Sequence, residues 1–151
     1  MKLLLPLFAV TLALVAGLPT STIPYPTITL LVARDDSILV HWTKIKNVNT
    51  EDPIIGYIVK VWEFPDVIVY KYDIVDGEVV VTQEKTEAKV DLTNIPSGRP
   101  REINVAGGDI TNAIIDNTRP NVLYHIRVLA YTKTQEGPLS PGSSIKLIKE
   151  D

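Results

Sequence analysis

Alternation of apolar and polar residues with a period of two is the feature that most restricts what this chain can fold into. Residues 37–43 and 56–64 show it most clearly, and residues 122–132 repeat it over a longer stretch. Turn-forming residues separate these segments, and no helical period is found between residues 27 and 149. Such alternation predicts half-buried strands. At this spacing it predicts an all-β sandwich or barrel of about eight to ten strands.

Further strands are expected at 27–33, 67–75, 78–83 and 144–148, with another at 88–92. Asp76-Gly77 separates two β-branched runs, and such a pair predicts a tight hairpin because both turn residues must take a positive φ. Residues 102–105 and 110–115 are expected to form a second hairpin across residues 106–109.

The first residues have the form of an export signal. Lys2 precedes an apolar run from Leu3 to Leu18, and small residues stand before the expected cleavage point. A membrane anchor is the alternative, but the run contains Pro6 and is shorter than the roughly 20 residues that span a bilayer. We therefore expect residues 1–17 to be a signal peptide, residues 18–26 an N-terminal extension, and the mature protein to be secreted. No integral membrane segment is expected after cleavage.

Charge and cysteine content exclude several kinds of function. A net charge of −3 leaves no basic surface for nucleic acid, and the absence of cysteine excludes disulfide scaffolds, thiolate metal sites and cysteine nucleophiles. His41 and His125 fall on strands expected in opposite sheets, both pointing outward into solvent, so they cannot share a metal ion. No residue pattern of a nucleophile elbow or phosphate loop occurs. We expect no catalytic residues, no cofactor, no metal site and no enzymatic activity.

Three stretches carry a resemblance to a known family. They are Ser37–Trp42, Ile55–Val61, and Pro120–Ala130 followed by Gly137–Ser140. In order and spacing they are similar to the fibronectin type III family, in which they hold a strand with a single buried Trp, a strand opened by Gly-Tyr, and a tyrosine corner with the sixth strand. The resemblance implies an immunoglobulin-like β-sandwich over residues 27–149. Alternation independently places five side chains inward: Trp42, Tyr57, Tyr124, Ile126 and Val128.

The chain also departs from the family pattern. Thr118 stands where the family usually has a Leu six residues before the corner Tyr, so Ile115 would fill that place from a shifted register. The family module runs to about 90 residues, and residues 66–109 hold more than its middle requires. We expect residues 66–109 to be an enlarged insert between the third and fifth strands.

One surface stands out as a candidate interface. The third and sixth strands of the family are neighbours, and their outward side chains here include five large apolar residues: Ile58, Trp62, Phe64, Leu129 and Tyr131. A contiguous exposed patch of this kind marks an interface, with another protein or with a second copy. The alternative is that residues 66–109 fold across this face and make it a second small core.

The resemblance implies a protein that binds rather than catalyses. We expect a secreted protein-binding module that acts on an extracellular partner or by self-association, as a soluble ligand, an antagonist or a surface antigen. The alternative from another class is a secreted carrier of small hydrophobic ligands, of lipocalin-like or transthyretin-like type, because a barrel would use the same alternation.

Overall fold

The computed structural model describes residues 22–149. The expected signal peptide and the first part of the N-terminal extension lie outside these residues. Within them the chain forms nine strands: β1 (Ile28–Arg34), β2 (Ser37–Trp42), β3 (Gly56–Pro65), β4 (Val67–Val75), β5 (Glu78–Thr86), β6 (Arg101–Ala106), β7 (Asn112–Ile115), β8 (Val122–Tyr131) and β9 (Ser143–Lys146). The described residues contain no helix, so the all-β prediction is confirmed.

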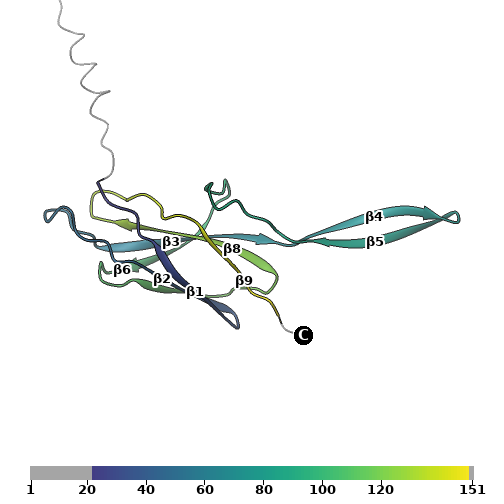
Figure 1. Cartoon of the computed structure of the whole chain (residues 1–151), viewed down its shortest axis with the longest axis horizontal. Helices are drawn as coiled ribbons and strands as arrows, with labels where there is room; N and C mark the ends of the chain where they lie inside the picture. The colour runs from purple at the N-terminus through teal and green to yellow at the C-terminus, as the bar shows by residue number, and fades with distance from the viewer. Residues whose placement is uncertain (1–21, 150–151) are drawn as a thin grey trace, which may run out of the picture.

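Seven of the strands form two antiparallel sheets that face one another (Figure 1). One sheet has the order β1-β2-β7, and the other has the order β6-β3-β8-β9. The long strands β3 and β8 pair along their whole length, from Gly56 opposite Tyr131 to Pro65 opposite Val122. This pair forms the centre of the larger sheet.

Two sequence predictions within the middle of the chain are wrong. Residues 88–92 form no strand. They lie in an irregular segment whose Leu92 carbonyl accepts a hydrogen bond from Arg127 of β8. The expected hairpin of residues 102–105 and 110–115 does not exist either, because β6 pairs with β3 and β7 pairs with β2. Gly107 has a φ of 126° and its N–H donates to the carbonyl of Ile55, and the connection then crosses from one sheet to the other.

The core lies between the two sheets and is made of the side chains that alternation places inward. All five expected inward residues (Trp42, Tyr57, Tyr124, Ile126 and Val128) are buried there. Ile115 is also fully buried in this cluster, and the backbone N–H of Arg119 donates to the Tyr124 hydroxyl at 2.7 Å. The tyrosine expected at the corner before the sixth strand of the sandwich therefore holds the turn that leads into β8.

Strands β4 and β5 form a separate two-stranded ribbon, residues 67–86, that projects away from the sandwich (Figure 1). Every residue of both strands is exposed. Its turn is Asp76-Gly77, with φ values of 51° and 83°, as the type I′ hairpin requires. The sequence thus predicted the hairpin and its turn.

The carboxylate of Asp66 links the ribbon to the sandwich. Asp66 lies between β3 and β4, its side chain is 5 % exposed, and it pairs with Lys146 of β9 at 3.0 Å and with Lys85 of β5 at 3.1 Å. The backbone N–H of Ala88 donates to the same carboxylate. The hydrogen bond from Lys146 is the main reason that the pKa of Asp66 is lowered to about 2. Asp66 therefore joins β5 of the ribbon to β9 of the larger sheet through ionic contacts.

Candidate binding surface

The five candidate interface residues lie on one face of the larger sheet, the face of β3 and β8 that points away from the core. Alternation places them there, and the strand register confirms that Ile58 is opposite Leu129 and that Trp62 is opposite His125. Their exposure differs, however. Trp62 and Leu129 are buried, whereas Ile58, Phe64 and Tyr131 are half-buried. An interaction through these five residues stays a prediction.

Residues 87–100, here called the cover segment, lie over the centre of this outward face. The indole N–H of Trp62 donates to the Gly98 carbonyl at 2.7 Å. The Arg127 guanidinium donates to the carbonyls of Leu92, at 2.8 Å, and Asn94, at 3.1 Å. Since the cover segment forms no strand, these side-chain donors satisfy carbonyls that have no backbone partner in a sheet.

Arg127 is the centre of this arrangement. Alternation along β8 points this side chain away from the core, where solvent would be expected, but only 6 % of the residue is exposed. Besides the two carbonyls of the cover segment, its guanidinium donates to the Ser140 carbonyl and to Nε2 of His125. Among residues 22–149 it forms no ion pair. A buried charge of this kind is tolerated only when several hydrogen bonds compensate its lost hydration.

His125 is likewise buried rather than solvated, contrary to the sequence prediction. Its ring and the Trp62 ring system are nearly perpendicular, with ring centroids 5.5 Å apart, and a Cβ added to Gly142 would lie 2.8 Å from Nε2. Its Nδ1 is buried without a hydrogen-bond partner in the described part of the chain. Desolvation, with a smaller contribution from the Arg127 charge, lowers the pKa of His125. The imidazole is therefore neutral and accepts from Arg127.

The depressed pKa of His125 predicts a pH dependence of stability. Below a pH of about 6.5, the unfolded chain binds a proton at this residue that the folded chain does not bind. The free energy of unfolding should therefore be constant above pH 7 and fall on acidification, by at most about 1.4 kcal/mol per pH unit. Urea denaturation at pH 7.5, 6 and 5 measures this slope. His125→Gln should flatten the slope between pH 7 and 5, and an unchanged slope would contradict the assignment.

A groove remains beside the cover segment, near the end of β3. Its volume is about 340 Å³, and its lining combines apolar with charged side chains: Trp62, Phe64, Ile95, Pro96, Lys89 and Arg99. No residue pattern in the sequence indicated this groove, because it depends on where the cover segment lies. In this groove an apolar group could contact the aromatic side chains of Trp62 and Phe64.

Comparison with known proteins identifies the family. The family model of the fibronectin type III domain matches residues 24–146. The chain belongs to the fibronectin type III family. Domains of this family commonly serve as protein-interaction modules and are typically non-catalytic. No curated protein sequence matches this fibronectin type III chain.

A solved structure of fibronectin type III domains shows the same fold at low sequence identity, and two others are less similar by TM-score. The chain is similar to the FN1–FN3 domains of chicken CNTN1, with 18 % identity, a TM-score of 0.54, and coverage of 84 % of this chain and 33 % of that one. It is also similar to a protein described as a myokine, with 13 % identity, a TM-score of 0.49 and coverage of 83 % and 97 %. The third fibronectin III domain of human KIAA0343 matches with 14 % identity, a TM-score of 0.48 and coverage of 90 % and 94 %.

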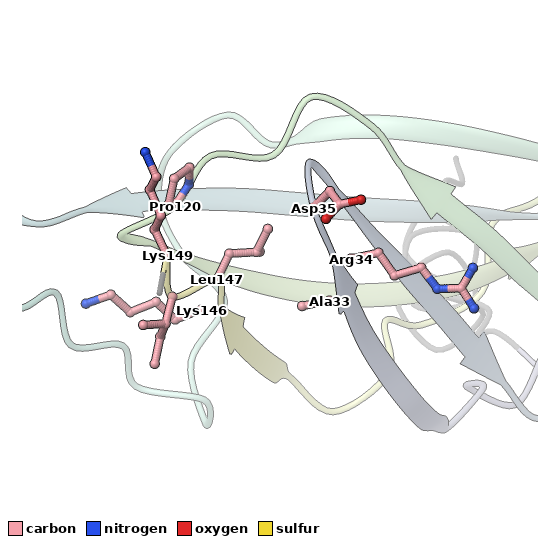
Figure 2. Close-up of a pocket in the computed structure, with 8 residues that line it drawn as sticks. Ala33, Arg34, Asp35, Pro120, Lys146, Leu147 and Lys149 are labelled. Carbon is pink, nitrogen blue, oxygen red and sulfur yellow. The ribbon is translucent and has the colours of Figure 1, made fainter. Parts of the chain in front are cut away.

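A second groove of this fibronectin type III domain lies at one edge of the sandwich, between the turn after β1 and the end of β9 (Figure 2). It has a volume of about 690 Å³ and a basic rim that includes Arg34, Lys146 and Lys149. Figure 2 shows that the Arg34 side chain extends away from the two lysines, and Lys146 is already paired with Asp66. The cations therefore do not converge on one point where an anion could bind.

The described part of the domain offers no cluster for metal chemistry. No group of three or more His, Asp or Glu side chains within residues 22–149 is placed to hold a metal ion. In the same range, no helix has the length and apolar character needed to cross a membrane.

Proposed function

We propose that this fibronectin type III domain is a secreted, non-catalytic module that acts through protein–protein contact outside the cell, with an extracellular partner or by self-association. The signal-peptide form of the sequence at residues 1–17 supports secretion, and the common role of the family supports protein binding. A soluble ligand, an antagonist and a surface antigen are the roles that fit a secreted module of this kind. The observation that carries the proposal is the ribbon, because it presents a group of large apolar side chains to solvent.

The ribbon supports protein binding more strongly than the outward face of β3 and β8 does. Ten of its valine, isoleucine and tyrosine side chains are exposed: Val67, Ile68, Val69, Tyr70, Tyr72, Ile74, Val75, Val79, Val80 and Val81. A contiguous apolar surface of several hundred Å² on a water-soluble domain marks an interaction site. On the outward face, the cover segment already occupies the centre, which leaves Ile58, Phe64 and Tyr131 as contact candidates at its ends.

Site-specific photocrosslinking tests this function. A photoreactive phenylalanine analogue is placed at Tyr72, and in a matched protein at Val80, which lies on the opposite face of the ribbon. Each purified protein is irradiated in the medium of the cells that produce it. The expected result is a protein adduct of defined mass from position 72 and little from position 80. The absence of any protein adduct from position 72 would overturn the proposal.

A carrier of small hydrophobic ligands is the second candidate, and the groove of about 340 Å³ beside Phe64 is the observation that favours it. Native mass spectrometry of the purified protein tests this alternative. A bound apolar molecule that is lost in Phe64→Ser would support a carrier. A mass equal to the bare chain would leave protein binding as the function.

A further inference from the structure

The two faces of the ribbon differ in chemistry. Val81 lies opposite Tyr72 and Val80 lies opposite Asp73, and opposite residues share a face. One face therefore carries Ile68, Tyr70, Tyr72, Ile74, Val79 and Val81, with Gln83 and Lys85 toward the base. The other face mixes valines with polar and charged side chains, among them the Lys71–Glu84 ion pair. The ribbon thus has one nearly continuous apolar face.

This apolar face has no counterpart within the described part of the molecule. The ribbon projects beyond the sandwich (Figure 1), and Tyr72, Ile74 and Val79 are each at least two-thirds exposed, at 69 %, 78 % and 67 %. A two-stranded ribbon alone is at best marginally stable in water, so covering this face would stabilise it. Its six apolar side chains offer roughly 700–800 Å² of accessible surface, about what one partner contributes to a standard interface.

The attachment of the ribbon favours a second copy in the opposite direction. Both strands join the sandwich at the base of the ribbon, where Lys85 is already paired with Asp66. At the tip, Glu78 lies opposite Val75 on the other face, so its charge is absent from the apolar face. When two ribbons stack face to face and antiparallel, the two sandwiches lie at opposite ends, where they do not collide.

The tyrosines fit the same arrangement. Tyr70 and Tyr72 lie on either side of the midpoint of the apolar face, so a two-fold axis through that midpoint places Tyr70 of one copy over Tyr72 of the other. Aromatic pairs of this kind add to the energy of burial. An isologous contact of this type closes on itself as a dimer.

We propose that two copies of this protein associate through the apolar faces of their β4–β5 ribbons, packed antiparallel about a two-fold axis. This inference rests on the proposed function and deepens it, because it names a second copy of the chain as the molecule that packs on the apolar face of the ribbon.

Sedimentation equilibrium on the purified protein tests the dimer. The wild type should sediment as a dimer, and Tyr72→Lys should raise the dissociation constant at least about 30-fold, the effect of losing a strong aromatic contact. Val80→Lys is the matched control, because it makes the same change of charge on the opposite face, where Asp73 lies across from it. It should leave the dissociation constant within about threefold of the wild-type value.

The orientation of the two copies is tested by a spin label at Glu78→Cys, in a chain without other cysteines. Antiparallel packing separates the two tips by roughly 25–30 Å, given a rise of about 3.4 Å per residue. A separation below about 15 Å would overturn the antiparallel arrangement.

Three outcomes of the oligomer measurement overturn the proposal. They are a wild-type monomer, a dimer equally weakened by both lysine substitutions, and a dimer unaffected by Tyr72→Lys. A monomer whose position 72 crosslinks to a different protein would overturn the dimer and leave the proposed protein-binding function standing. A monomer without any crosslink would overturn both.

Discussion

Replacing Arg127 by methionine is expected to lower the free energy of unfolding by about 3–5 kcal/mol, because the change leaves two buried and two partly buried acceptors without a donor. Methionine keeps an apolar stem of similar length but removes every hydrogen bond of the guanidinium. The carbonyls of Leu92, Asn94 and Ser140 lose this donor together, as does Nε2 of His125. Urea denaturation monitored by tryptophan fluorescence measures the loss.

The same substitution should release the cover segment from the outward face. Cleavage by trypsin after Lys89 should become at least about tenfold faster than the loss of global stability alone would cause. Lys60→Met is the matched control. Lys60 lies opposite Arg127 on the same face and is paired with the exposed Glu102, so its loss should cost less than about 1 kcal/mol. Equal effects of the two substitutions would contradict the role assigned to Arg127.

The sandwich could be predicted from the sequence because its strands are encoded locally. Inward residues such as Trp42 and Val128 recur every second position, and an interior that excludes water requires this period. The Asp76-Gly77 turn could be predicted for a similar reason, since few residue pairs adopt positive φ at both positions. These signals identify the strands and one hairpin without information on the rest of the chain.

The burial of the outward face could not be predicted in this way. Alternation gives the direction of His125 and Arg127 relative to their strand, but burial depends on what lies over them. In this protein the cover segment lies over them, and hydrogen bonds from the side chains of Trp62 and Arg127 hold it in place. The close approach of Gly142 to His125 also becomes visible only in three dimensions.

The residues 102–105 and 110–115 were misassigned for a related reason, because local sequence does not show which sheet a short strand joins.

The exposed ribbon was the other part of the molecule that sequence reasoning left incomplete. The hairpin itself was expected, but its β-branched residues read equally well as strands of the core. Only the structure shows that both strands stand outside the sandwich (Figure 1). This difference moves the strongest candidate for protein contact from the face of β3 and β8 to the apolar face of the ribbon.

Tyr57 is the second residue whose replacement should have a large effect. It is fully buried, and its ring contacts Trp42 with ring centroids 5.3 Å apart. Its hydroxyl accepts from the backbone N–H of Ile45 at 3.2 Å and donates to the Gly108 carbonyl at 3.1 Å. Tyr57→Phe should therefore lower the free energy of unfolding by about 2–3 kcal/mol, since it leaves two backbone groups unsatisfied. Tyr57→Ala should cost about 3–5 kcal/mol through loss of the ring.

The matched control for the hydroxyl is Tyr131→Phe. The Tyr131 hydroxyl donates to the Asn104 side chain at 2.8 Å in a solvent-exposed position, where water replaces the lost partner, so this change should cost less than about 0.5 kcal/mol. Urea denaturation of the three variants beside the wild type gives the comparison. A Tyr57→Phe effect as small as that of Tyr131→Phe would mean that water satisfies Ile45 and Gly108. The Tyr57 hydroxyl would then have no structural role in joining the loop before β3 to the connection between the two sheets.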